Sequence, residues 1–213
     1  MKYHTKAEKF FTKEERERIK ETTRKVESGT TGEVVVMVVD HSDRYPEAEV
    51  MGGVLLGSLL SLILTLAAFD GSLWTYVPLS VLFFFPSRQL FRKVTRLGAA
   101  LIGVRRKHHA VRERAVRAFY EKGLYCTTQN TGVLFFLSLL ERKVWVIADK
   151  GIHEKIGQET LNKFARAVSR GIRDGRACDA LCEAIGEAGA LLAVHFPAGP
   201  GHDDQLPDDV ITG

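Results

Sequence analysis

The stretch 50-VMGGVLLGSLLSLILTLAAF-69 contains twenty consecutive residues without a charge. At about 1.5 Å of rise per residue, a helix of this length is roughly 30 Å long, which is the thickness of the hydrocarbon core of a bilayer. A second apolar run, residues 73–85, begins after the short polar turn at residues 70–72. We therefore predict a two-helix transmembrane hairpin over residues 50–87.

The second run is the shorter of the two. Residues 71–87 contain seventeen residues without a charge, which is the lower limit for a membrane span, and Pro78 lies among them. Trp74 and Tyr76 lie near its start, as is typical of a helix end at the membrane–water interface. The alternative is a buried helical hairpin in a soluble domain. A soluble helix of this size normally keeps one polar face, so the membrane interpretation is favoured.

Small residues recur every fourth position in the first run, at Gly53, Gly57 and Ser61. Such a stripe allows the backbones of two membrane helices to approach closely. We expect these residues to pack against the second helix of the hairpin, or against a second copy of the protein in a homo-oligomer.

The charge distribution predicts the orientation in the membrane. Residues 88–117 contain ten Lys or Arg and one acid, whereas residues 1–47 carry ten of each sign. Basic residues next to a membrane helix favour the cytoplasmic side, and a hairpin returns the chain to the side it started from. We expect an integral protein of the inner (cytoplasmic) membrane with both soluble pieces in the cytoplasm. No apolar stretch precedes Val50, so no secretory signal peptide is expected.

The net charge of +4 is concentrated beside the predicted hairpin, which favours anionic lipid head groups over nucleic acid as the partner. Arg88, Arg92, Lys93 and Arg96 are the expected head-group contacts. Apolar residues at spacings of four and three run from Leu90 to Val104. They predict a helix that lies on the membrane surface or packs on the soluble domain.

The rest of the chain alternates helical and strand patterns around a single core. Thr12 and Glu15 form a capping box that starts a helix ending near Glu27. The other expected elements are a strand at 34–39, a helix at 104–119, a hairpin of strands at 133–139 and 143–148, a helix facing the sheet over 156–172, and a last helix ending before Pro197.

These elements predict an α+β fold, a sandwich with a small mixed sheet, interrupted by the transmembrane hairpin. The expected divisions are residues 1–49, 50–87 and 88–196, followed by an acidic Gly/Pro-rich tail at 197–213 that is extended and frayed at its end.

Five motifs occur in order along the chain: 31-TGE-33, the helix 112–119, 131-TGVLF-135, 141-ERKV-144 and 148-ADKGI-152. Together with 196-FP-197 and 206-LPD-208, they resemble the TPM domain family in its short, membrane-embedded bacterial branch. The resemblance covers nearly the whole chain. It implies a role of the kind ascribed to family members, which includes photosystem repair, receptor regulation, phosphatase activity and calcium binding. The absence of a signal peptide departs from the common secreted form.

Three acids end or start predicted strands: Glu33, Asp40 and Asp149. If they converge at one sheet edge, their oxygens could hold a divalent cation such as calcium. A phosphatase would need such a cation to stabilise the transferring phosphoryl group. The alternative is that Thr31 and Thr131 are turn or cap residues, that Asp149 caps a loop, and that Gly32, Gly132 and Gly151 supply backbone freedom.

Other candidate metal ligands are explained more simply. Cys178 and Cys182 share a helix face and, with His195, could be imagined as zinc ligands, but packing in a helix interface accounts for them better. His108 and His109 adjoin basic residues and belong to a basic surface. The acidic tail, which contains Asp203, Asp204, Asp208 and Asp209, is expected to be solvated.

Two functions follow from these patterns. The first is a membrane-anchored TPM-type binding or scaffolding module that acts in assembly or turnover of membrane protein complexes, with a membrane protein or a second copy of itself as partner. The second is a cation-dependent phosphatase with Glu33, Asp40 and Asp149 as metal ligands. No phosphate-binding glycine loop or nucleophile motif favours the second.

Overall fold

The structure, a computed structural model, describes residues 5–127, 130–198 and 209–213. It consists of two compact units. The first contains the chain up to Ser42 and from His108 onward, and the second runs from Asp43 to Lys107. The inserted unit is therefore longer at both ends than the expected hairpin at 50–87.

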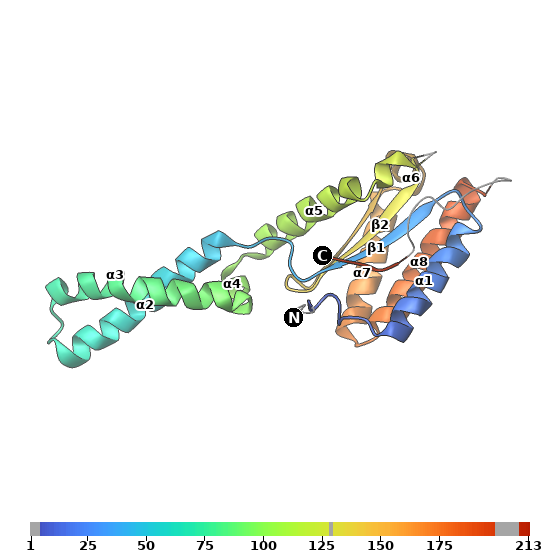
Figure 1. The fold of residues 1–213 in the computed structure, drawn as a ribbon. Coiled ribbons are helices and arrows are strands. Elements are labelled where there is room, and N and C mark those ends of the chain that lie inside the picture. Colours follow the sequence, from blue (N-terminus) through green and yellow to red (C-terminus); the bar gives the residue numbers. More distant parts are fainter. Residues whose placement is uncertain (1–4, 128–129, 199–208) are drawn as a thin grey trace. The chain divides into compact units, whose positions relative to one another are not determined.

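A mixed sheet of four strands forms the centre of the first unit, in the order β3-β2-β1-β4 (Figure 1). β1 (Glu33–Val39) and β2 (Gly132–Ser138) are parallel, and β3 (Lys143–Ala148) is antiparallel to β2. The two-residue strand β4 (Ile211–Thr212) pairs in parallel with β1. Every residue of β1 and β2 is buried, which is typical of strands covered on both faces.

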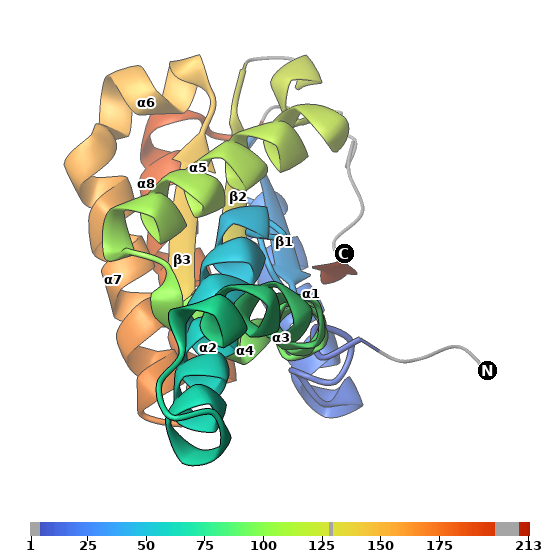
Figure 2. The same ribbon diagram turned by 90° about the vertical axis from the view of Figure 1, so that its left-hand side faces the viewer.

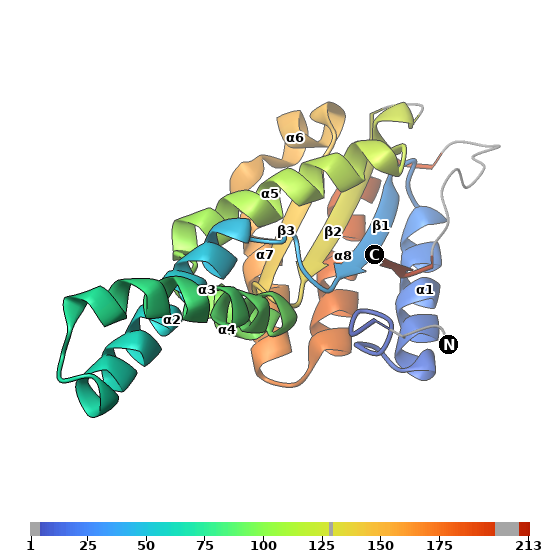
Figure 3. The ribbon, with the colours of Figure 1, turned by 60° about the vertical axis from the view of Figure 1, so that its left-hand side comes forward.

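Helices cover both faces of this sheet (Figures 2 and 3). Val36 and Phe135 point to the face covered by α1 (Lys13–Glu27), α6 (Lys150–Ile156), α7 (Gln158–Arg173) and α8 (Ala177–His195). Met37 and Phe136 point to the opposite face, which is covered by α5 (Val104–Glu121) and the 3-10 turn η1 (Leu124–Cys126). The predicted α+β class with a small mixed sheet is confirmed.

Local signals place the first elements. Thr12 Oγ1 accepts a hydrogen bond from the Glu15 N–H at 3.2 Å, and Glu15 Oε2 accepts one from the Thr12 N–H at 2.8 Å, so the capping box is present. At the other end of α1, the buried Glu27 accepts a hydrogen bond from the Val34 N–H at 2.8 Å. This bond joins the end of α1 to the start of β1.

The helix expected over 156–172 is present as α7, and the short helix α6, which was not predicted, precedes it. Gly157, with φ of +77°, separates the two. One helical prediction was wrong. The amphipathic pattern from Leu90 to Val104 does not form one helix. It is divided among the end of α3 (Leu73–Lys93), α4 (Thr95–Leu101) and the start of α5, with breaks at Val94 and Ile102.

The prediction of a frayed C-terminal end was wrong. Ile211 and Thr212 lie in register with Met37 and Val38, and the Gly213 N–H donates to the Val38 carbonyl at 3.2 Å. The pairing gives β1 a neighbour on its free side. The acidic residues Asp203, Asp204 and Asp208 lie outside the described residues.

The second unit contains two long helices, α2 (Pro46–Ala68) and α3 (Leu73–Lys93), which lie side by side (Figure 1). The turn between them has positive φ at Asp70 and Gly71. α3 continues to Lys93, six residues beyond the predicted end of the hairpin at residue 87, with Pro78 and Pro86 inside it. Within the described part of the chain, α2 is the one helix long and apolar enough by itself to cross a membrane.

Candidate functional site

The small residues of α2 lie against α3. A Cβ atom built on Gly57 would come within 2.9 Å of the Phe84 backbone N, and one on Gly53 within 3.0 Å of the Arg88 Cβ and a Phe84 ring carbon. Ser61 is fully buried. The close approach of the two backbones is the arrangement that a small-residue stripe permits.

The outward sides of α2 and α3 are apolar and exposed. Large side chains on them include Leu59, Ile63 and Leu66 of α2 and Val77, Val81 and Leu82 of α3. Leu66 has 65% of its surface exposed. Monomeric soluble proteins rarely expose contiguous apolar surface of this kind, so something other than water is expected to cover it.

Basic and aromatic side chains lie at opposite ends of α3. Trp74 is in the first turn, and Arg88, Arg92 and Lys93 are exposed in the last turns. Arg96 lies in α4, and its side chain is outside the described part of the structure. From Trp74 to Arg88, the first charged residue of α3, the helix rises by roughly 21 Å.

A cluster of ion pairs connects the first and last residues of the second unit. The Arg106 guanidinium donates to Glu47 at 3.0 Å and to Asp43, and it lies 5.4 Å from the centre of the Tyr45 ring. Burial disfavours the charged form of Asp43, but hydrogen bonds from Arg106 and from the Arg44 N–H outweigh it and hold the pKa of Asp43 below its usual value. The cluster joins the start of α2 to the start of α5.

The three predicted cation ligands do not come together. Glu33 begins β1 and Asp40 follows its end, so the two are separated by the length of a seven-residue strand, roughly 23 Å. Asp40 accepts hydrogen bonds from the Lys6 and Ala7 N–H groups at 3.2 and 2.6 Å, which ties down the N-terminal segment.

Asp149 lies at the same end of the sheet as Glu33, where its N–H donates to the Gly132 carbonyl at 2.9 Å. Its Oδ1 accepts from the Lys150 N–H at 2.7 Å, which makes it the N-cap of α6. Among the described residues, no three His, Cys, Asp or Glu side chains form a group that could hold a metal ion.

The two Thr-Gly motifs meet at this end of the sheet. The Thr131 hydroxyl donates to the Thr31 carbonyl at 2.8 Å, and the Glu33 N–H donates to the Thr131 carbonyl at 3.1 Å. Gly132 has no room for a side chain, because a Cβ there would lie 2.4 Å from the Leu124 carbonyl oxygen. These motifs therefore hold the starts of β1 and β2 together.

The cysteines and His195 do not form a zinc site. Cys178 is buried in α8, and burial raises the pKa of its thiol to about 12, which keeps it protonated and unreactive. His195 ends the same helix, seventeen residues from Cys178 and therefore roughly 25 Å away. His109 is paired with Glu113 at 3.2 Å, one helical turn along α5.

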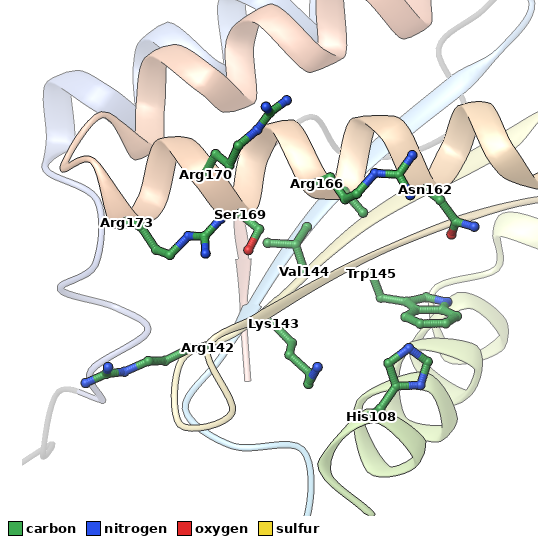
Figure 4. A pocket seen from close by; sticks show the side chains of 11 residues that line it. His108, Arg142, Lys143, Val144, Trp145, Asn162, Arg166, Ser169, Arg170 and Arg173 are labelled. Carbon is green, nitrogen blue, oxygen red and sulfur yellow. The ribbon is translucent and has the colours of Figure 1, made fainter. Parts of the chain in front are cut away.

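A cationic groove that the sequence analysis missed lies between β3 and α7 (Figure 4). Its volume is about 640 Å³. The β2–β3 turn and β3 contribute Arg142 and Lys143, and α7 contributes Arg166, Arg170 and Arg173. Trp145 and His108 lie at the opposite end from Arg142 in Figure 4, with their ring centres 4.8 Å apart and nearly perpendicular. The signal in the sequence is the spacing of four and three among the α7 arginines, which places them on one helix face.

Comparison with known proteins supports the fold. No protein-family profile matches the sequence, and no curated protein matches it. Among solved structures, the chain is similar to the NMR structure of the BA42 protein from the psychrophilic bacterium Bizionia argentinensis, with a TM-score of 0.60, 19% sequence identity and 96% of each chain covered. At this identity, the similarity establishes a shared fold.

Proposed function

We propose that this protein is a membrane-anchored binding module, in which α2 and α3 span the bilayer as a hairpin and the α/β unit binds its partner at the cytoplasmic face. The observation that carries the anchor is the exposed apolar surface of the helix pair. In water, each large apolar side chain left exposed forgoes about 1.5–3 kcal/mol of burial. Contact with lipid removes this penalty. A bilayer around α2 and α3 therefore explains their exposed apolar side chains without a protein partner.

Three features support a span by α3 as well as α2. Residues 71–87 carry no charge over seventeen residues, the lower limit for a membrane span, and they lie almost entirely within α3. Trp74 at its start and Arg88 near its end suit the two interfaces. Pro78 and Pro86 are tolerated in membrane helices that pack on a neighbour. The basic residues that follow α3 support the cytoplasmic placement of the α/β unit, with anionic head groups beside Arg88, Arg92 and Lys93.

Membership of the TPM family is part of the proposal. It is supported by the position of the motifs in the fold, because 31-TGE-33 precedes β1 and 131-TG-132 opens β2, and the two are joined by hydrogen bonds. A binding role, rather than catalysis, is supported by the separation of Asp40 from Glu33 and by the size and charge of the groove between β3 and α7.

Charges placed on the outward side of α2 test the anchor. Leu59 and Ile63 are 53% and 56% exposed and lie near the middle of the helix. An arginine at the centre of a membrane helix costs about 2.5–3.5 kcal/mol, so the double variant Leu59→Arg/Ile63→Arg is expected to lose membrane insertion. The measurement is the fraction of protein left in the membrane pellet after alkaline carbonate washing.

The matched control carries arginine at Val116 and Val194, which are 39% and 75% exposed on the α/β unit. It should remain in the pellet as the wild type does. Recovery of the wild-type protein as a soluble monomer in the carbonate supernatant would contradict the anchor, and so would full retention of the double variant. In a soluble protein, the same surface arginines would cause little change.

A further inference from the structure

The groove between β3 and α7 collects positive charge from two parts of the fold, the start of β3 and the helix α7. Arg142 precedes β3, Lys143 begins it, and Arg166, Arg170 and Arg173 are spaced four and three apart along α7. In Figure 4 the Arg173 side chain extends toward β3 and the Arg170 side chain extends away from it. Among the residues that the structure describes, no carboxylate lines the groove. A hollow lined by one sign of charge focuses the electric field and concentrates ions of the opposite sign.

The described residues leave the charges of the groove without ion pairs. None of the five cations has an ion-pair partner in the described part of the chain, whereas other surface cations do. Arg18 pairs with Asp179 at 2.6 Å, and Arg114 pairs with Glu121 at 2.9 Å. Unpaired like charges repel one another, and this repulsion is relieved when an anion binds among them.

The β2–β3 turn holds Arg142 in an unfavourable backbone conformation. Its φ of +52° lies in the left-handed region, where glycine or asparagine is preferred. Glu141 fixes the turn, because its carboxylate accepts hydrogen bonds from the Ser42 N–H at 3.1 Å and from the Ser138 hydroxyl. The arginine at this position is therefore better explained by its side chain than by the backbone.

The other end of the groove also offers donors. Asn162 Oδ1 accepts a hydrogen bond from Gln158 at 3.1 Å, which leaves the Asn162 amide N–H groups to donate. Burial and then the charge of Lys143 lower the pKa of His108, so its ring is neutral near pH 7. Guanidinium, ammonium and amide donors together suit a ligand rich in acceptor oxygens, and arginine in particular binds phosphate with two parallel hydrogen bonds.

We propose that this groove binds a phosphate ester that carries more than one phosphate group, either as a soluble metabolite or as the head group of a phosphorylated lipid. Its volume of about 640 Å³ falls in the range of small-molecule sites and exceeds the needs of a single phosphate ion. This inference rests on the proposed function, because it names the ligand class of the proposed binding module. Binding in the groove can nevertheless be tested without a bilayer.

The test titrates inorganic pyrophosphate into the full-length protein in neutral detergent and follows tryptophan fluorescence. The chain contains two tryptophans, so the change Trp74→Phe leaves Trp145 in the groove as the sole reporter. Saturable binding that weakens with rising salt is expected. The variant Arg166→Gln/Arg170→Gln should weaken binding at least tenfold, since each change removes charge-assisted hydrogen bonds to phosphate.

Two further variants separate binding from folding. Arg142→Gly removes one guanidinium and also relieves the positive φ, so it should weaken pyrophosphate binding several-fold without lowering the midpoint of urea unfolding. Lys163→Gln removes an exposed charge from α7 outside the groove and should leave binding unchanged. Absence of saturable binding, or equal loss in the Lys163→Gln and Arg166→Gln/Arg170→Gln proteins, would overturn the proposal.

Nanodiscs distinguish the two sources of the ligand. Discs that contain a phosphatidylinositol phosphate are compared with discs of equal charge made with phosphatidylserine. A lipid ligand would compete with pyrophosphate only in the phosphoinositide discs, and a soluble ligand would leave pyrophosphate binding the same in both. If the protein does not bind pyrophosphate in detergent but still resists extraction from the membrane by carbonate, the proposed ligand site is wrong and the proposed membrane anchor is not affected.

Discussion

Replacement of Gly57 by leucine is expected to separate α2 from α3. A Cβ at this position would lie 2.9 Å from the Phe84 nitrogen, 3.0 Å from its Cα and 3.1 Å from the Phe83 carbonyl carbon. All three are backbone atoms, which cannot rotate away as the end of a side chain can. Overpacking usually costs about 1–3 kcal/mol, and we expect the upper end of this range or more because the whole of α3 must shift.

Cross-linking measures the separation. The Ser58 and Tyr76 hydroxyls lie 2.6 Å apart across the helix pair. Cysteines placed at these two positions, in a protein whose three native cysteines are alanine, should be joined by a short bifunctional thiol reagent within one molecule. We expect the yield of this product to fall several-fold when Gly57→Leu is added.

Gly103 provides the matched control. It lies in the same unit, and a Cβ built there meets nothing within 4 Å, so Gly103→Leu should leave the cross-linking yield unchanged. A high yield in the Gly57→Leu protein would mean that the close contact between α2 and α3 is not what holds the pair together. A fall in yield in both variants would point to a general effect of leucine in this unit.

Elements set by local chemistry could be predicted from the sequence, because their signals lie within a few residues. The Thr12–Glu15 capping box marks the start of α1, and the runs of branched residues mark β1 and β2. β4 could not be predicted, because two residues carry no periodicity and their partners Met37 and Val38 lie at the other end of the chain. Such pairing depends on the tertiary fold.

The same limit applies in part to the candidate sites. Each of Glu33, Asp40 and Asp149 could be placed at a strand end. The separation of Glu33 from Asp40 follows from the length of β1 alone, so their convergence could have been excluded from the sequence. The place of Asp149 depends on strand direction, because β2 is parallel to β1 and β3 is antiparallel to β2, which brings Asp149 to the end of the sheet where Glu33 lies. The groove could not be predicted from the sequence, because it forms only where β3, the edge strand of the sheet, lies beside the arginines of α7.

Replacement of Phe135 by alanine is expected to have the largest effect on the α/β unit. Phe135 is fully buried in the middle of β2, in register with Val36 on one side and Val146 on the other. Removing a buried phenylalanine costs about 3–5 kcal/mol, which is a large share of the 5–15 kcal/mol that stabilises a typical protein. Urea unfolding followed by Trp145 fluorescence, in the Trp74→Phe protein, should show this loss.

The proposed membrane anchor should survive this change, because α2 and α3 belong to one compact unit and Phe135 belongs to the core of the other. The Phe135→Ala protein should therefore stay in the pellet after carbonate washing even at urea concentrations that unfold its sheet. Val194→Ala, at a position 75% exposed, should shift neither measurement. Release of Phe135→Ala from the membrane together with unfolding of the sheet would mean that the hairpin depends on the α/β unit for its insertion. That outcome would replace two independent units by one cooperative structure, and it would move the cause of membrane attachment from the apolar faces of α2 and α3 to the sheet domain itself.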